Sequence, residues 1–293
     1  MGQAETILLD FKQTKDFIDR KLREYIASED PLLHPLQESI RYSLFSGGKR
    51  IRPLFSFIIG DLFGISHAKL VPLSCAIEMI HAASLIMDDL PHMDGAMTRR
   101  GKPANHIVFG QDVAALASIG LMMKAYEIIL ADPLLTTREK TNVARILVNA
   151  VGVNGMVGGQ FVDLRFPKES LDHHVIEYIH DHKTVALFSA AGEAAGVIGG
   201  ATTEDIKAVT EYARNVGFAF QILDDLLDFS GAAEEVGKPV HQDRLNFVSL
   251  YGPERSKELV EMYTNRAIET TRIFGNRNAK LVALAHMLLD RKT

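Results

Sequence analysis

Hydrophobic residues recur at helical spacing from Leu36 onward, and alternating, strand-like patterns are scarce. One stripe runs through Ile40, Leu44 and Phe45, and similar stripes cover residues 77–87 and 113–130. Glycine pairs and prolines between the stripes mark helix ends and turns. The pattern therefore predicts about ten helices and an all-α fold.

Two of these helices, at residues 77–87 and 185–198, are apolar on almost every side. A helix of this kind is surrounded by other helices rather than lying on a surface. No stretch resembles a linker between domains, so we expect residues 1–293 to form a single-domain helical bundle. Residues 229–246 are the best candidate for a long loop.

Composition narrows the function classes. With 32 basic and 37 acidic residues, the net charge of −5 gives no general attraction for nucleic acid or an anionic membrane. The single cysteine, Cys75, excludes an intrachain disulfide, and the first residues lack a signal-peptide pattern, so we expect a cytoplasmic protein. The uncharged stretches fall short of the roughly 18 residues that suggest a membrane span, so no transmembrane segment is expected.

An acidic pattern in the run GFAFQILDDLLDF carries the first chemical signal. On a helix Gln221, Asp224, Asp225 and Asp228 share one face, where their carboxylates repel one another. A hard divalent cation would remove that repulsion. Taken by itself, the pattern also fits a solvated acidic helix face.

A second acidic cluster strengthens the metal interpretation. Asp88, Asp89 and Asp94 follow another apolar helix, and Pro91 must disturb or end that helix. Oxygen ligands of this kind favour Mg²⁺, with Mn²⁺ as an alternative, and such ions take further ligands from phosphate oxygens. The two clusters could face one cavity.

Basic residues gather in GGKRIRP at residues 47–53 and in TRRGKP at residues 98–103. In a net acidic protein these are local sites for a polyanion, since arginine binds phosphate through two parallel hydrogen bonds. Each group could instead be an ordinary solvated loop. Lys183 opens an otherwise apolar helix, where a lysine is costly to bury without a partner.

With these motifs in order, the chain resembles the trans-isoprenyl diphosphate synthases, the farnesyl and geranylgeranyl diphosphate synthases of bacterial and plastid type. The resemblance covers roughly residues 36–252. The two aspartate-rich motifs of that family match DDLPHMD from Asp88 and DDLLD from Asp224, and GGKRIRP matches the element that holds isopentenyl diphosphate.

The resemblance implies a role for each matching residue. The implied metal ligands are Asp88, Asp89, Asp94, Asp224, Asp225 and Asp228. The implied ligands of isopentenyl diphosphate are Lys49, Arg52, His81 and Arg100. The implied ligands of the allylic diphosphate are Arg99, Lys183, Thr184, Gln221 and Lys238. Catalysis is assigned to Asp88, Asp89, Asp224 and Lys183, and the segment GMVGGQFVDL contributes Gln160 and Asp163.

The resemblance further implies a deep central cavity, a homodimer and about three Mg²⁺ ions that withdraw the allylic diphosphate. The isopentenyl double bond then attacks the resulting carbocation, and the departing diphosphate takes the proton. The small residues Ala83 and Ser84 stand where relatives set product length, which favours a twenty-carbon over a fifteen-carbon product. Deeper residues could instead close the pocket, among them Ile80, and Ile119 or Met123 on another helix.

Three departures from the family pattern keep alternatives open. Residues 95–98 lack the acids common there, Leu245 stands where a second diphosphate-binding lysine is expected, and Ser118-Ile119 replaces a common Gly-Asp pair. The alternatives are an inactive or regulatory partner subunit of a prenyl synthase, and a terpene cyclase or head-to-head synthase. The two basic elements favour a chain-elongating enzyme, since they suit a second diphosphate substrate.

Overall fold

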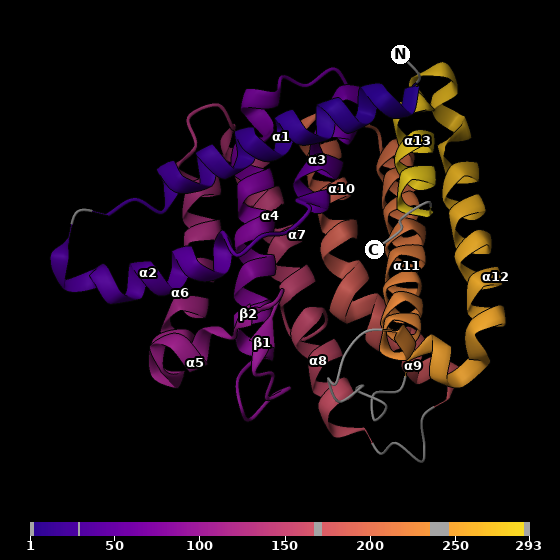
Figure 1. Ribbon diagram of the computed structural model, residues 1–293. Helices are drawn as coiled ribbons and strands as arrows, with labels where there is room; N and C mark the ends of the chain where they lie inside the picture. The colour runs from indigo at the N-terminus through magenta and orange to yellow at the C-terminus, as the bar shows by residue number, and fades with distance from the viewer. Residues whose placement is uncertain (1–2, 29, 167–171, 235–245, 290–293) are drawn as a thin grey trace. The chain divides into compact units, whose positions relative to one another are not determined.

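Helices form nearly all of the regular structure in the computed structural model, which describes residues 3–28, 30–166, 172–234 and 246–289 (Figure 1). The exception within these ranges is one antiparallel pair of two-residue strands, β1 (Thr98–Arg99) and β2 (Lys102–Pro103). The predicted all-α fold is therefore confirmed.

Contacts group the chain into two compact units. The N-terminal unit contains Leu8–Ala144 with Val197–Gly199, and the C-terminal unit contains Arg145–Gly196 and Gly200–Thr293 with Met1–Ile7. The chain passes from one unit to the other inside α1, α7 and α10. The expected single domain over residues 1–293, with its deep central cavity, stays a prediction.

In the N-terminal unit, α4 forms the core. It is buried along most of its length and packs against α2, α3 and α6. Small residues on α6, among them Ala114, Ala117 and Ser118, are buried and allow close packing of helices. The elements of this unit, besides the strands, are α1 (Gln3–Tyr25), η1 (Pro31–Leu33), α2 (His34–Leu44), α3 (Ile51–Leu62), α4 (His67–Asp88), α5 (Asn105–Phe109), α6 (Gln111–Ala131) and the start of α7 (Thr137–Val151).

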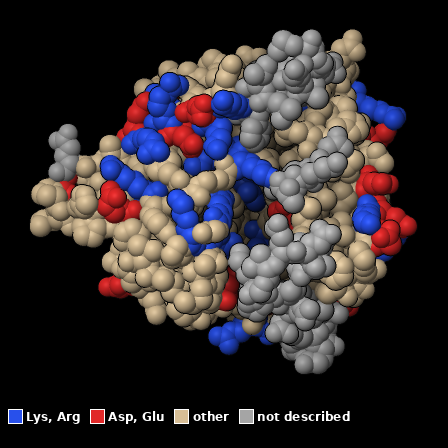
Figure 2. Space-filling view, in the orientation of Figure 1, with Lys and Arg blue, Asp and Glu red and all other residues tan. Residues whose placement is uncertain are grey.

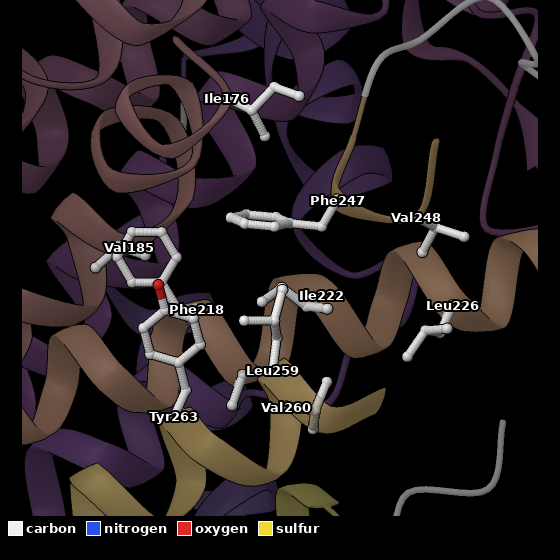
Figure 3. Close-up of a cluster of buried hydrophobic side chains, with 11 residues drawn as sticks. Ile176, Val185, Phe218, Ile222, Leu226, Phe247, Val248, Leu259, Val260 and Tyr263 are labelled. Carbon is white, nitrogen blue, oxygen red and sulfur yellow. The ribbon is translucent and has the colours of Figure 1, made fainter. Parts of the chain in front are cut away.

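In the C-terminal unit, the long helix α11 packs against α12, α13 and a π-helical turn, η3. Figure 3 shows a cluster of buried side chains between α11 and α12, in which the Phe247 ring lies near Ile222 of α11. The elements of this unit are α8 (Met156–Arg165), α9 (His173–His180), η3 (Asp181–Val185), α10 (Ala186–Ile198), α11 (Thr203–Glu234), α12 (Phe247–Thr270), η4 (Thr271–Asn278) and α13 (Ala279–Leu289).

Two local expectations need correction. The loop predicted for residues 229–246 begins later, because α11 continues to Glu234; residues 235–245 lie outside the described ranges. The basic segment TRRGKP forms the turn of the β1–β2 hairpin, which a strand of two residues is too short to reveal through alternating hydrophobicity.

Two described helices, α4 and α6, are long and apolar enough to cross a membrane by length and composition. In α4, 78% of the most apolar 18-residue window is buried inside the protein, whereas in α6 the corresponding window is 39% buried and one apolar face is exposed. The predicted absence of a transmembrane segment stays a prediction.

Candidate active site

The β1–β2 hairpin determines where Arg99 and Arg100 lie. Thr98 pairs with Pro103 and Arg99 with Lys102, so Arg100 and Gly101 form the two-residue turn. Both turn residues have positive φ angles, 53° and 74°, as tight hairpin turns require. The Tyr42 hydroxyl donates to the Pro103 carbonyl at 2.8 Å and ties the hairpin to α2.

A pocket in the N-terminal unit collects several of the predicted residues. Its wall contains both arginine and acidic side chains. Lys and Arg side chains gather on the face drawn in Figure 2. The basic and acidic side chains of its wall are Arg50, Glu78, His81, Asp89, Arg99 and Arg100.

Two of the three arginines in this pocket are neutralised by acidic partners. Arg50 pairs with Glu78 and Asp19, and Arg99 pairs with Asp89. In contrast, no carboxylate among the described residues pairs with Arg100, whose Nη1 donates to the carbonyl oxygen of Gly47. Burial lowers the pKa of Arg100, and the charges of Arg50 and Arg99 lower it further, although Glu78 acts in the opposite direction. Such a guanidinium favours an anion.

His81 lies beside the same cations. Its Nε2 is 3.5 Å from Nη1 of Arg52. Burial, followed by the charges of Arg52 and Arg100, lowers the pKa of His81 well below its usual value, so the imidazole is neutral at physiological pH. The structure thus places Arg52 and Arg100 near His81, whereas Lys49 lies exposed on the loop before α3.

The first aspartate cluster lies at the C-terminal end of α4. As predicted, the helix ends before Pro91, at Asp88, and the Asp94 amide donates to the Asp88 carbonyl at 2.8 Å. Gly95 follows with a φ of 62°, which suits glycine. The predicted metal ligand Asp89 is only 3% exposed and is engaged by Arg99, one of the predicted diphosphate ligands.

The second aspartate cluster lies on α11, where a chain of hydrogen bonds orients Asp225. The Thr184 hydroxyl donates to Oε1 of Gln221 at 2.9 Å, and Nε2 of Gln221 donates to Oδ1 of Asp225 at 2.9 Å. The other carboxylate oxygen, Oδ2, is buried without a hydrogen-bond partner among the described residues. Burial raises the pKa of Asp225 to about 7, and Asp224 and Asp228 add to the rise, against the Gln221 hydrogen bond.

The imidazole of His180 lies next to this carboxylate, with Nε2 3.8 Å from Oδ2 of Asp225. Burial lowers the pKa of His180 to about 4, so at neutral pH the two groups do not form an ion pair. The His180 ring also packs on Phe247, the first residue of α12, with ring centroids 5.1 Å apart. Asp225 therefore lies in a tightly packed, largely dry environment.

Lys183 lies on the π-helical turn η3 and pairs with Asp163 of α8 at 2.7 Å. The close approach of α8 to η3 depends on Gly159, since a Cβ atom there would lie 2.7 Å from the Lys183 amide nitrogen. Both polar atoms of the Gln160 amide are buried without a hydrogen-bond partner among the described residues. The Gln160 amide can therefore donate and accept hydrogen bonds with a bound ligand.

The aspartate side chains offer oxygen ligands for a metal ion. Within the described ranges, no three acidic, histidine or cysteine side chains already converge on one point. The Asp225 carboxylate nevertheless keeps one buried oxygen without a hydrogen-bond partner, beside two further aspartates on the same helix. A buried acidic oxygen that lacks a donor suits a hard cation such as Mg²⁺, so the donor set fits the expected ion.

The two predicted chain-length residues differ in their surroundings. Ala83 is fully buried, and its carbonyl accepts a 2.8 Å hydrogen bond from the Ser118 hydroxyl of α6. Ser84 is half-buried, and its hydroxyl donates to the His81 carbonyl at 2.9 Å. Ile119 and Met123, the alternative closing residues, are more than half exposed on α6.

Lys238 and Leu245 lie outside the described residues. The partners of Arg50, namely Asp19 and Glu78, were not singled out by the sequence patterns. Glu78 did leave a signal, because it is an acidic residue inside the apolar run of α4, where a buried charge needs a partner. No comparable signal marks Asp19 in the charged helix α1.

Comparison with known proteins agrees with these motifs. Residues 34–269 match the polyprenyl synthetase family. The chain is 40% identical to geranylgeranyl pyrophosphate synthase 3, chloroplastic, of Arabidopsis thaliana, over 96% of this chain and 82% of the relative. It is 36% identical to a geranylgeranyl diphosphate synthase of Cyanophora paradoxa, over 95% and 94%.

Solved structures give the same result. The crystal structure of an FPP/GFPP synthase from Zymomonas mobilis superposes with a TM-score of 0.89 at 32% identity, covering 98% of this chain and all of that one. A geranyltransferase from Legionella pneumophila gives a TM-score of 0.85 at 30% identity, covering 98% and 96%. The fold is thus that of the isoprenoid synthases, and the chain belongs to the polyprenyl synthetase family.

Proposed function

We propose that this protein is a short-chain trans-prenyltransferase that condenses isopentenyl diphosphate with an allylic diphosphate. The observation that carries the proposal is the guanidinium of Arg100 in the wall of the pocket, which lies near Arg50 and Arg99 and has no carboxylate partner within the described residues. A site for a second diphosphate is what distinguishes chain elongation from cyclisation of one substrate. The farnesyl and geranylgeranyl synthases among the relatives support the same reaction.

In this reaction, the side chains bind and orient the substrates while the bond changes occur in the substrates themselves. Lys49, Arg52, His81 and Arg100 hold the diphosphate of the isopentenyl substrate, and Arg99, Lys183, Thr184, Gln221 and Lys238 hold that of the allylic substrate. The bond between the allylic carbon and the diphosphate oxygen breaks, and the isopentenyl double bond supplies the electron pair of the new carbon–carbon bond. The departing diphosphate takes the proton that is lost. Buried apolar walls exclude the water that would quench the cation.

Mg²⁺ is part of the proposal. Asp88, Asp89, Asp94, Asp224, Asp225 and Asp228 would hold it. The ion would act as a Lewis acid on the leaving diphosphate, with Mn²⁺ as a substitute. The orphaned oxygen of Asp225 supports this assignment, and the hydrogen bonds from Thr184 through Gln221 would hold that carboxylate in one orientation.

The test is turnover by the purified protein. Isopentenyl diphosphate is incubated with Mg²⁺ and, separately, with five-, ten- and fifteen-carbon allylic diphosphates, and the products are identified by mass spectrometry. Elongated linear diphosphates are the expected products. Cyclic or head-to-head products without use of isopentenyl diphosphate would favour the alternative enzyme class. A lack of turnover that a copurifying homologous chain restores would favour the partner-subunit hypothesis.

We further propose that the protein is a homodimer that pairs through α6. Four large apolar side chains on this helix are more than half exposed, which is unusual for a surface facing water. They are Leu116, Ile119, Met123 and Leu130. Light scattering after size exclusion should give a dimer for the wild type and a monomer for an Ile119→Glu/Met123→Glu variant. Location in the cytoplasm stays a prediction, and several relatives are named as chloroplastic.

A further inference from the structure

We propose that Arg50 is a positioning residue, which binds no substrate but holds the loop at residues 47–50 and the start of α3 in the shape that isopentenyl diphosphate requires. The proposal rests on the proposed function, because it assigns a task to one arginine of the GGKRIRP segment. Arg50 is adjacent in sequence to Lys49 and two residues before Arg52, both predicted diphosphate ligands.

Every nitrogen of the Arg50 guanidinium has a partner inside the protein. Nε and Nη2 lie 2.8 Å from Oδ1 of Asp19, Nη2 donates to the Leu44 carbonyl at 2.6 Å, and Nη1 donates to Glu78. The side chain is only 3% exposed. Burial would lower the pKa of Arg50, but Glu78 and Asp19 outweigh it and raise the pKa above its usual value. A phosphate would have to displace these partners to reach it.

The backbone conformation of Arg50 points to the same role. Arg50 has a φ of 50° in the left-handed region, which is unfavourable for a residue with a side chain. Such a conformation persists where surrounding contacts determine it, and here the buried guanidinium ties the residue to α1, α2 and α4. Its carbonyl oxygen accepts the Leu54 amide at 3.1 Å and so starts α3. Arg50 therefore fixes the direction in which the loop enters the helix.

The same loop contacts Arg100, the pocket arginine that has no carboxylate partner among the described residues. Gly47 and Gly48 have φ angles of 108° and 121°, and the Gly47 carbonyl accepts from Arg100. A Cβ atom on Gly48 would lie 2.8 Å from Nη1 of Arg100, so this guanidinium packs directly on the loop backbone. A shift of the loop would displace Arg100 together with Lys49 and Arg52.

Arg50 therefore has a role that charge alone does not provide. Its own charge is balanced by Glu78 and Asp19, so it adds little to the attraction for an anion. What it supplies is a planar fork that engages three partners at once, which the point charge of lysine cannot do. The Arg50→Lys variant should therefore keep the positive charge but no longer hold the loop before α3 in place.

Two variants test the proposal. Arg50→Lys keeps a cation, and Arg50→Met/Glu78→Leu removes the buried pair together, so that the double variant leaves no uncompensated Glu78 charge. The matched control is Lys69→Met/Glu139→Leu, which removes an ion pair of 2.6 Å between α4 and α7 in the same unit. Thermal melting of each variant records its effect on stability.

The readouts are steady-state kinetics and calorimetric binding of inorganic pyrophosphate in EDTA. Both Arg50 variants should raise the KM for isopentenyl diphosphate about tenfold or more, which corresponds to about 1.4 kcal/mol. The KM for the allylic substrate and kcat should change by less than about twofold, because the proposal leaves the allylic ligands in place. Pyrophosphate affinity should fall by a similar factor, and the control should change neither quantity.

The outcomes separate this proposal from the proposed function. Turnover by the wild type, with unchanged KM and pyrophosphate affinity in Arg50→Lys, would overturn the positioning role alone. Equal increases in both KM values, or the same increase in the control, would show a general structural effect and would also overturn it. If the wild type does not use isopentenyl diphosphate, the proposed function fails, and the pyrophosphate measurement still decides whether Arg50 shapes an anion site.

Discussion

The guanidinium of Arg99 is paired with the carboxylate of Asp89. Nε of Arg99 donates to Oδ1 at 3.0 Å and to Oδ2 at 3.2 Å, and Nη2 also donates to Oδ1. One partner is a predicted diphosphate ligand and the other is a predicted metal ligand. Each must therefore exchange its present partner for a substrate or an ion during the proposed reaction.

This ion pair makes metal binding compete with Arg99. In Arg99→Met the Asp89 carboxylate loses that competitor, and we expect Mn²⁺ to bind about tenfold more tightly in the absence of diphosphate, given the usual strength of charged hydrogen bonds. Calorimetric titration with Mn²⁺ measures this. Arg41→Met, which breaks a surface pair with Glu38, is the control and should not alter Mn²⁺ affinity. Weaker Mn²⁺ binding in Arg99→Met would contradict the competition.

Metal dependence follows from the second cluster. Asp224→Asn keeps the size of the side chain and removes one charge from the acidic face of α11, so we expect turnover to fall by orders of magnitude with little loss of stability. The matched control is Asp205→Asn, at the first turn of the same helix. Turnover is measured with excess Mg²⁺ and again after chelation. Activity that survives both EDTA and Asp224→Asn would refute the metal assignment.

Stability should depend on pH through Asp225. Because burial raises the pKa of this carboxyl from 3.8 to about 7, the folded protein holds a proton that the unfolded chain releases. The contribution of Asp225 to stability is therefore complete below pH 3.8 and is lost as the pH rises toward 7. The loss approaches about 1.4 kcal/mol per pH unit within that window.

Urea unfolding in EDTA tests this dependence. It is measured at several pH values between about 4.5 and 7.5, a range that covers the rise in the pKa of Asp225 on folding. The wild type should lose stability with rising pH relative to Asp225→Asn, whose amide does not titrate. Parallel curves for the two proteins would show that Asp225 is charged throughout. Added Mg²⁺ should reduce the difference at high pH, since the ion favours the charged carboxylate.

Product length should respond to Ser84 and not to Ala83. Ala83 is fully buried under α6, so Ala83→Phe overpacks the core and should cost about 1–3 kcal/mol of stability. Ser84 keeps an accessible face, so Ser84→Phe should fold and shorten the product. Chromatography of the dephosphorylated products, alongside thermal melting, separates the two effects. An unchanged product from a folded Ser84→Phe protein would place the limit elsewhere.

Much of the candidate site could be predicted from sequence because aspartates at helical spacing lie on one face wherever the helix forms. The regular geometry of α11 was enough to predict that one helix face carries Gln221, Asp224, Asp225 and Asp228. The end of α4 at Asp88 was predictable for a similar reason, since Pro91 cannot continue a helix with normal hydrogen bonding.

Contacts between distant segments could not be predicted in this way. The Arg99–Asp89 pair depends on a hairpin whose strands are two residues long, and the Arg50 network joins α1, the end of α2 and α4. Nothing local in the sequence specifies which acid meets which arginine. The packing of α6 on Ala83 likewise involves Ser118, which lies thirty-five positions further along the chain and donates a hydrogen bond to the Ala83 carbonyl.

The π-helical turn at Asp181–Val185 restricts how the length of this segment can vary. A π turn holds an additional residue compared with an α turn, and here successive residues reach different helices, Lys183 to Asp163 of α8 and Thr184 to Gln221 of α11. Deleting one residue from the turn would restore α geometry and rotate the preceding helix by about 100° relative to α10. At least one of the two contacts would be lost in that rotation. Functional relatives should therefore have their insertions and deletions outside this turn.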